Sequence, residues 1–127
     1  MKFLPNQTVC ELFEQQVAAT PDAVAIVCGD QELSFFRLNE RANQLAHHLI
    51  RLGVERAQRV AVCLERSPEM IVGLLGILKA GGAYVPLDPT YPDDRLEFIV
   101  RDSGARWCLS HASTTARLKV SWLITRW

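Results

Sequence analysis

Two spacings of apolar residues alternate along the chain. Apolar positions at helical spacing predict helices near residues 8–19, 35–52, 68–80 and 92–102. Short and mostly apolar runs between them predict strands near residues 23–28, 59–64, 83–85 and 106–110. Strands that alternate with helices favour an α/β fold, in which a mainly parallel sheet is layered with helices.

Polar residues and prolines stand where these helices should begin. Thr8 and Glu11 have the spacing of a capping box, in which each side chain satisfies a backbone N–H of the first turn. Ser67 precedes Pro68, which places a preferred N-cap residue before a proline at the first helical position. Gly81 follows a helix and is suited to the left-handed conformation that ends it. These signals support the boundaries that the apolar spacing gives.

The connections between strands predict how two of the pairs align. Every residue of the run 59–64 after Arg59 is apolar, which is typical of a strand covered on both faces. The helix at 68–80 is a natural crossover from that strand to 83–85, so we expect the two strands to be parallel neighbours. Gly29-Asp30 predicts a tight turn after which the chain returns as a short antiparallel strand.

The composition describes one modest domain of 127 residues, in which 49% of residues are hydrophobic. Lys and Arg balance Asp and Glu at 14 each, which argues against a nucleic-acid or membrane-surface role. Met1–Leu4 is followed at once by Pro5 and is too short for a signal peptide, and no apolar run is long enough to span a membrane. The sequence therefore predicts a cytoplasmic protein.

The end of the chain differs in composition from the rest. No acidic residue follows Asp102, and all three tryptophans lie after that position. Val120–Ile124 has the apolar character of a last strand. We expect residues 111–127 to be a divergent or poorly ordered tail, because chain ends that are not tied down are usually poorly ordered.

The four cysteines, Cys10, Cys28, Cys63 and Cys108, lie far apart and form no Cys-x-x-Cys pair. Spacing of this kind predicts neither a metal site nor a disulfide framework. Most of them lie in apolar runs, where a free thiol behaves as a small hydrophobic residue. We expect free thiols in a reducing compartment.

Four groups of residues have the composition of a functional site: His47-His48; Gly81-Gly82; Asp93, Asp94 and Glu97; and Ser34 with Ser67. Each group has a structural explanation. The histidines lie in the last turns of a predicted helix, the glycines follow a helix end, the acids follow a helix-starting proline, and the serines stand at N-cap positions. The sequence therefore predicts no catalytic residue, no cofactor-binding residue and no metal ligand.

A resemblance to a known family rests on the segment Leu78–Asp88. It resembles the second core motif of the adenylation domains of nonribosomal peptide synthetases. The likeness continues through Asp88–Pro92, Arg95-Leu96 and Asp102–Ala105. That family, which is part of the AMP-forming ligase superfamily, activates an amino acid as its adenylate with ATP and Mg and passes it to a carrier domain as a thioester.

The first core motif of the same family is similar to Leu33–Leu38, and Thr20–Ala25 is similar to its entry strand. Two positions depart from the motif. Phe35 replaces the usual tyrosine, and Arg37 replaces the usual glutamate, which removes the capping box with Ser34 and weakens the helix start. Neither departure touches a chemical step.

The resemblance covers about residues 8–110 and implies that residues 1–127 are a partial adenylation domain, an incomplete N-terminal subdomain of an adenylate-forming enzyme. In the family the phosphate loop, the adenine and amino-acid pockets and the catalytic lysine all follow this region. His111–Ala116 contains serine and threonine but lacks the glycine-rich pattern of that loop. The resemblance thus implies ATP and Mg for a full-length parent and no cofactor bound by this chain.

Two function classes follow. The first, which we favour, is a catalytically inactive N-terminal piece of an amino-acid-adenylating enzyme, from a truncated, fragmented or decayed gene. The second is a stand-alone α/β interaction module that docks to a synthetase. The expected partners are the remainder of a peptide synthetase or a second copy of the chain, and neither nucleic acid nor a membrane.

Overall fold

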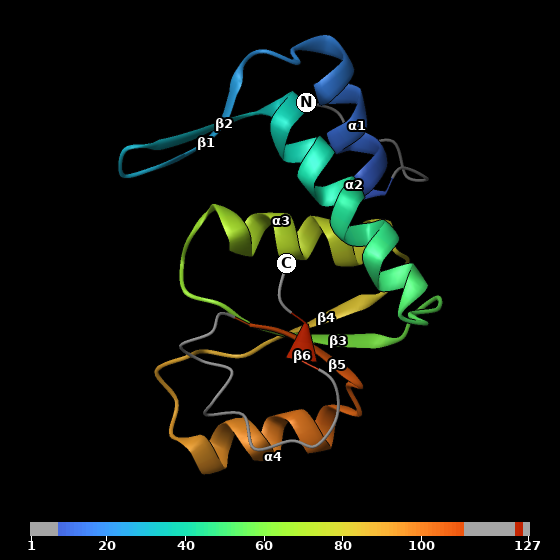
Figure 1. Ribbon diagram of the computed structural model, residues 1–127, viewed down its shortest axis with the longest axis vertical. Helices are drawn as coiled ribbons and strands as arrows, with labels where there is room; N and C mark the ends of the chain where they lie inside the picture. Colours follow the sequence, from blue (N-terminus) through green and yellow to red (C-terminus); the bar gives the residue numbers. More distant parts are fainter. Residues whose placement is uncertain (1–7, 111–123, 126–127) are drawn as a thin grey trace.

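The structure is a computed structural model that describes residues 8–110 and 124–125 (Figure 1). Its elements in chain order are α1 (Val9–Ala19), β1 (Val24–Cys28), β2 (Gln31–Ser34), α2 (Phe35–Arg51), β3 (Arg59–Cys63), α3 (Pro68–Lys79), β4 (Ala83–Pro86), α4 (Asp93–Ser103), β5 (Trp107–Ser110) and β6 (Ile124–Thr125). The predicted helices and strands are confirmed, and each boundary lies within one residue of its expected position.

The main sheet has the strand order β4-β3-β5-β6, and all of its pairs are parallel. The predicted neighbours β3 and β4 pair from Arg59 with Ala83 to Val62 with Pro86. β4 runs one residue further than expected because a proline is tolerated at the end of an edge strand. Of the strand expected at Val120–Ile124, only Ile124 lies within the described residues, and it belongs to β6. The other residues of the predicted tail lie outside the described residues, apart from Thr125.

A separate antiparallel hairpin precedes this sheet. β1 and β2 pair with Cys28 opposite Gln31, which confirms the expected return strand after the turn at Gly29-Asp30. The register shifts between Val24 and Ile26, so the hairpin carries an irregularity near its open end. In Figure 1 the hairpin projects to one side of α2, away from the main sheet.

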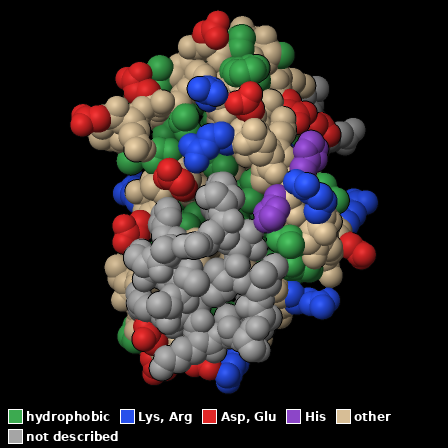
Figure 2. Space-filling model, in the orientation of Figure 1, with side chains coloured by type: hydrophobic (Ala, Val, Ile, Leu, Met, Phe, Trp, Pro, Cys, Tyr) green, Lys and Arg blue, Asp and Glu red, His purple; other side chains and the backbone are tan. Residues whose placement is uncertain are grey.

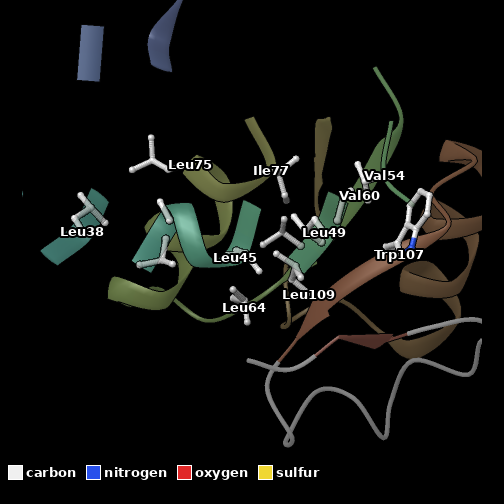
Figure 3. Close-up of a cluster of buried hydrophobic side chains, with 13 residues drawn as sticks. Leu38, Leu45, Leu49, Val54, Val60, Leu64, Leu75, Ile77, Trp107 and Leu109 are labelled. Carbon is white, nitrogen blue, oxygen red and sulfur yellow. The ribbon is translucent and has the colours of Figure 1, made fainter. Parts of the chain in front are cut away.

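The parallel sheet lies between two helical layers, with α3 on one face and α4 on the other (Figure 1). Alternate residues of β3 serve the two layers: Val60 and Val62 pack on the α3 side, and Ala61 and Cys63 pack on the α4 side. This confirms that the apolar run is covered on both faces. The larger cluster, on the α3 side, also takes in residues of α2 and β5, among them Leu45, Leu49, Trp107 and Leu109 (Figure 3).

α2 covers the side of α3 that the sheet leaves open, and α1 packs against both helices. Gly76 allows the close approach, because a Cβ atom built there would lie 2.6 Å from Leu45 Cδ2. Most of the apolar surface of α3 is therefore covered within the chain. Ile71, which is 37% exposed, is the exception among its large apolar side chains.

Candidate functional site

A groove opens at the carboxyl edge of the parallel sheet, between the ends of β3 and β4. The connection after β3 leads to α3 on one face of the sheet, and the connection after β4 leads to α4 on the opposite face. Because the two connections leave the sheet on opposite faces, a crevice opens at this edge between the ends of β3 and β4. This switch-point groove has a volume of about 760 Å³ and is lined by residues 64–66, Met70 and residues 86–91.

The walls of the switch-point groove are apolar, and its polar residues lie at the rim. Leu64 and Leu87 are buried beneath it, while Met70 and Tyr91 are half-buried. The exposed polar residues of the rim are Glu65, Arg66, Asp88 and Thr90. Small-molecule sites normally add a few convergent polar groups to an apolar pocket. The lining residues of this groove supply no buried polar side chain of that kind.

Hydrogen bonds hold the loop that forms one side of the groove. Asp88 Oδ1 accepts bonds from the Thr90 backbone N–H at 2.9 Å and from the Thr90 hydroxyl at 2.7 Å. These bonds, the backbone bond first, lower the pKa of Asp88. The Arg95 guanidinium carbon lies 4.9 Å from the centre of the Tyr91 ring. These contacts join residues within the loop and connect it to the first turn of α4.

A second cavity, of about 460 Å³, lies where α1 and α2 meet the end of α3, and it gathers ionisable side chains. Lys79 Nζ lies 2.7 Å from Glu14 Oε1, so the ammonium is held in an ion pair. Burial raises the pKa of the Cys10 thiol, and the charge on Lys79 offsets part of that rise. An engaged amine and a protonated thiol are poor nucleophiles. The ion pair of this cluster therefore joins the end of α3 to α1.

The predicted structural role of His47-His48 agrees with their positions. Both lie toward the C-terminal end of α2, where a histidine suits the negative end of the helix dipole. His47 is exposed and lines the second cavity, and His48 is half-buried. The histidines visible in Figure 2 lie on the surface among lysine and arginine side chains. His47 and His48 are not close to Asp93 and Asp94, because α4 lies on the opposite side of the sheet from α2.

Gly81 and Gly82 end α3 and do not begin a helix. The Gly81 N–H donates to the Leu78 carbonyl and the Gly82 N–H to the Ile77 carbonyl, each at 3.0 Å, and Gly81 has a φ of +88°. A phosphate loop needs free amides at the positive end of a helix dipole. Both amides already donate to carbonyls of α3 and lie at the negative end of its helix dipole, so they do not fit a nucleotide phosphate. The C-cap prediction is confirmed.

The acids of α4 and the two serines also have structural roles. Glu97 is paired with Arg101 at 2.5 Å, one helical turn further along the same helix. Ser34 Oγ accepts a bond from a backbone N–H of the first turn of α2 at 3.2 Å, and Ser67 Oγ does the same for α3 at 3.4 Å. Thr8 Oγ1 caps α1 in the same manner, at 3.1 Å. The N-cap predictions for Ser34 and Ser67 are confirmed, and of the capping box predicted for Thr8 and Glu11 the bond accepted by Thr8 is present.

All four cysteines are free thiols in the structure. Cys63 and Cys108 lie buried on the α4 side of the sheet, in the same apolar cluster. Burial, and secondarily the neighbouring Cys63, raises the pKa of Cys108 to about 12. Within residues 8–110 and 124–125, no three His, Cys, Asp or Glu side chains are placed to hold a metal ion. The prediction that this chain has no catalytic, cofactor-binding or metal site stays a prediction.

Two features of the described residues concern nucleic acid and a membrane as partners: the distribution of charge on the surface and the character of the helices. Acidic and basic side chains are interspersed among the described residues of the face in Figure 2. None of the described helices combines the length and the apolar character that a membrane crossing requires.

The family model described as "AMP-binding enzyme" matches residues 13–123. The chain belongs to the AMP-binding enzyme family. The match takes in the hairpin, all of the parallel strands up to β5 and the helices between them, so the sequence resemblance is confirmed over the greater part of the chain.

Curated relatives of this AMP-binding chain are parts of large peptide synthetases. It is 55% identical to a linear gramicidin synthase protein of Brevibacillus parabrevis over 91% of this chain, and 52% identical to bacitracin synthase 3 of Bacillus licheniformis over 80% of it. The chain spans only 2% of the length of either relative.

Solved structures of nonribosomal peptide synthetases share the fold. The AMPPNP-bound form of FmoA3 superposes with a TM-score of 0.91 at 29% identity, covering 98% of this chain and 14% of that one. The N-terminal subdomain of Klebsiella oxytoca NpsA, in complex with 3-hydroxyanthranilyl-AMSN, gives a TM-score of 0.86 at 25% identity, covering 94% of this chain and 31% of that one. The chain therefore corresponds to part of an adenylation-type AMP-binding domain.

The switch-point groove and the Lys79–Glu14 pair were not predicted from the sequence. The groove needs two connections to leave the sheet on opposite faces, and the apolar pattern alone does not assign a helix to a face. No sequence signal pointed to Glu14 as the partner of Lys79, because a cation in the last turn of a helix is already explained by the helix dipole.

Proposed function

We propose that this chain supplies the N-terminal part of an amino-acid-activating adenylation domain, residues 1–127 forming one partial domain, and that it forms no adenylate by itself. The observation that carries the proposal is the 55% identity to the linear gramicidin synthase protein over 91% of the chain. An alignment over 91% of the chain takes in the core-motif segments, which here form a helix end, a strand and an N-cap.

The proposed inactivity rests on what the motif residues do in the structure. Adenylate formation depends on charge positioned around the ATP phosphates. The amides of Gly81 and Gly82 are bonded to helix carbonyls, and Lys79 is paired with Glu14. ATP and Mg would accordingly be held by other parts of a longer protein. The proposal includes a cytoplasmic location, where ATP and amino acids are both available.

Amino-acid-dependent ATP–pyrophosphate exchange tests the proposal in two proteins. The isolated chain should show no exchange above background with any amino acid. A chimera, in which residues 8–110 replace the matching segment of bacitracin synthase 3, should exchange within about tenfold of the unmodified synthase. Exchange by the isolated chain, or none by the chimera, would contradict the proposal.

The alternative class, a stand-alone docking module, predicts a different result. Such a module would bind an intact synthetase and would not substitute for any part of it. Under our proposal the isolated chain instead leaves apolar surface without its normal cover. Within the part of the chain that the structure describes, the exposed large apolar side chains are Val9, Val24, Val27, Phe36, Ile50, Ile71, Tyr84 and Phe98. We expect the isolated chain to self-associate or to bind a hydrophobic dye. A compact monomer in sedimentation, without dye binding, would favour the docking module.

A further inference from the structure

We propose that a basic edge of this chain binds an acidic segment of another protein. The basic edge consists of four exposed arginines at the amino edge of the parallel sheet, Arg51, Arg59, Arg101 and Arg106. The inference goes beyond the proposed function, because it concerns an interaction surface and holds whether or not the chain belongs to an enzyme.

The paired ends of β3 and β5 place two of these arginines side by side. Val60 pairs with Trp107 in the parallel register, so Arg59 and Arg106, which precede them, stand at neighbouring strand ends. The Arg106 guanidinium carbon lies 5.6 Å from the centre of the Trp107 ring. Like charges at neighbouring positions of paired strands destabilise a sheet. An anion bound beside the two arginines would remove this cost.

The ends of α2 and α4 bring the other two arginines to the same place. Arg101 and Arg106 line a cavity of about 520 Å³ together with Leu52, which directly follows Arg51. A cation in the last turn of a helix suits the helix dipole, which accounts for Arg51 and Arg101. Arg59 and Arg106 lie outside the helices, so the dipole does not explain their positions.

The acids nearest to the basic edge leave most of its charge without a partner. Glu97 is paired with Arg101. Asp102 lies one helical turn after Phe98 and so on the same outer face of α4, where Phe98 is 66% exposed. Among the residues that the structure describes, no ion pair includes any of the other three arginines.

The rest of the chain has no acidic side chain to offer in their place. Neither Asp nor Glu occurs in residues 1–7, 111–123 or 126–127, which lie outside the described residues, and their Lys and Arg side chains only add positive charge. Glu55, in the connection after α2, stands next to Arg56, so these two charges offset each other. The anion that complements the basic edge must therefore come from another molecule.

The distribution of the charge favours an acidic polypeptide over a small anion or a nucleic acid. A single exposed charge contributes little to the binding of an ion in water. The four arginines come from α2, β3, α4 and the connection to β5, so a segment with several carboxylates can contact more than one of them at once. The formal net charge of the chain is zero, which does not suit a polyanion as long as DNA or RNA.

Fluorescence anisotropy with a labelled acidic peptide tests the proposal on the whole chain. The probe alternates glutamate and serine over about twelve residues, which when extended is long enough to cross the end of the sheet. A second probe has glutamine in place of every glutamate. Arg51→Gln/Arg106→Gln removes two charges from the basic edge. Arg37→Gln/Arg66→Gln is the matched control, because it removes two exposed charges at the start of α2 and at the opposite edge of the sheet.

The acidic probe should bind the unmodified chain, and the glutamine probe should not. Arg51→Gln/Arg106→Gln should weaken the binding of the acidic probe at least about fivefold, and the control pair should weaken it by less than about twofold. The affinity for the unmodified chain should fall as salt is added. No binding of the acidic probe, or an equal effect of the two pairs of substitutions, would overturn the inference.

Two competitors identify the other kinds of anion. Displacement of the acidic probe by inorganic phosphate at constant ionic strength would assign a small-anion site to the basic edge. Tighter binding of a DNA duplex than of the probe, lost in Arg51→Gln/Arg106→Gln, would assign a nucleic-acid site. Either result would overturn the inference and leave the proposed function intact, because the pyrophosphate exchange assays test that function separately.

Discussion

Lys79 Nζ lies 2.7 Å from Glu14 Oε1, and the contact joins the last turn of α3 to the middle of α1. The two partners are solvated very differently, since the Lys79 side chain is 6% exposed and the Glu14 side chain is 58% exposed. The ammonium also lies 5.7 Å from the centre of the Phe13 ring. The Lys79 side chain is thus largely desolvated, and its ammonium lies beside a carboxylate and an aromatic ring.

This asymmetry predicts that the loss of the Glu14 carboxylate destabilises the chain only while the Lys79 ammonium is present. Glu14→Gln removes the carboxylate from a desolvated ammonium and should lower the free energy of unfolding by about 1–2 kcal/mol. In the Lys79→Met background the same substitution should cost almost nothing, because no buried charge is left without a partner. Urea denaturation of the four proteins measures the coupling directly. A cost for Glu14→Gln that is equal in both backgrounds would show that the pair contributes nothing.

The contact of Gly76 with Leu45 predicts a second effect. Gly76→Ala would normally stabilise an exposed helix by about 1 kcal/mol. Here the added methyl group would lie 2.6 Å from Leu45 Cδ2 and 3.0 Å from Leu45 Cβ. Because Leu45 is 2% exposed and cannot move freely, we expect a net loss of about 1–3 kcal/mol in the free energy of unfolding.

Leu45→Ala supplies the matched control for that prediction. Alone it should destabilise the chain by about 2–5 kcal/mol, because it leaves a cavity between α2 and α3. Combined with Gly76→Ala it removes the 2.6 Å contact with Cδ2 and leaves only the 3.0 Å contact with Cβ, so the double variant should be more stable than the sum of the single effects predicts. Strict additivity in thermal or urea unfolding would mean that the two helices separate to accommodate the methyl group.

The sequence predicted the elements well, because their signals are local. The capping serines, the glycine ends and the spacing of Leu38, Ala42, Leu45 and Leu49 need no knowledge of neighbours in space. The parallel pairing of β3 with β4 was also predictable, since one crossover helix connects them.

The contacts that give the chain its specific shape were not predictable in the same way. The approach of Gly76 to Leu45, the pairing of Lys79 with Glu14 and the switch-point groove each join segments far apart in sequence. Periodicity shows that a residue is buried but does not identify the residue that it meets. The helix-ending role of Gly81 was predictable, because the glycine follows the apolar pattern of a helix.

The departure from the first core motif at Arg37 predicts a stabilising substitution. Arg37 lies in the first turn of α2, where a cation opposes the positive end of the helix dipole. Arg37→Glu places an anion there, restores the capping box with Ser34 and adds an i,i+4 pair with Arg41. It also gives up the exposed pair of Arg37 with Glu40, which contributes little.

We expect Arg37→Glu to raise the free energy of unfolding by about 0.5 kcal/mol. Arg37→Gln separates the two causes, since it keeps the reciprocal cap but adds no charge. It should give part of the gain, and the gain of Arg37→Glu alone should shrink as salt is added. A loss of stability for both variants would contradict the dipole argument.

The buried thiol of Cys108 predicts a loss of stability at high pH. Burial raises the pKa of this thiol from 9.0 to about 12 in the folded chain. The folded state therefore keeps the proton where the unfolded state releases it, so the free energy of unfolding falls as pH rises from about 9 toward 12. The slope that this thiol adds should be at most about 1.4 kcal/mol per pH unit.

Cys108→Ala isolates that contribution, because every other titratable side chain remains in both proteins. The difference between the two unfolding curves should be flat below pH 9.0 and should grow above it in favour of the variant. Alkylation gives an independent measurement, since a thiolate is the reacting species and Cys108 has no exposed surface. If Cys108 in the folded chain reacted with iodoacetamide near pH 9.0 as fast as in urea, neither its burial nor its raised pKa would stand.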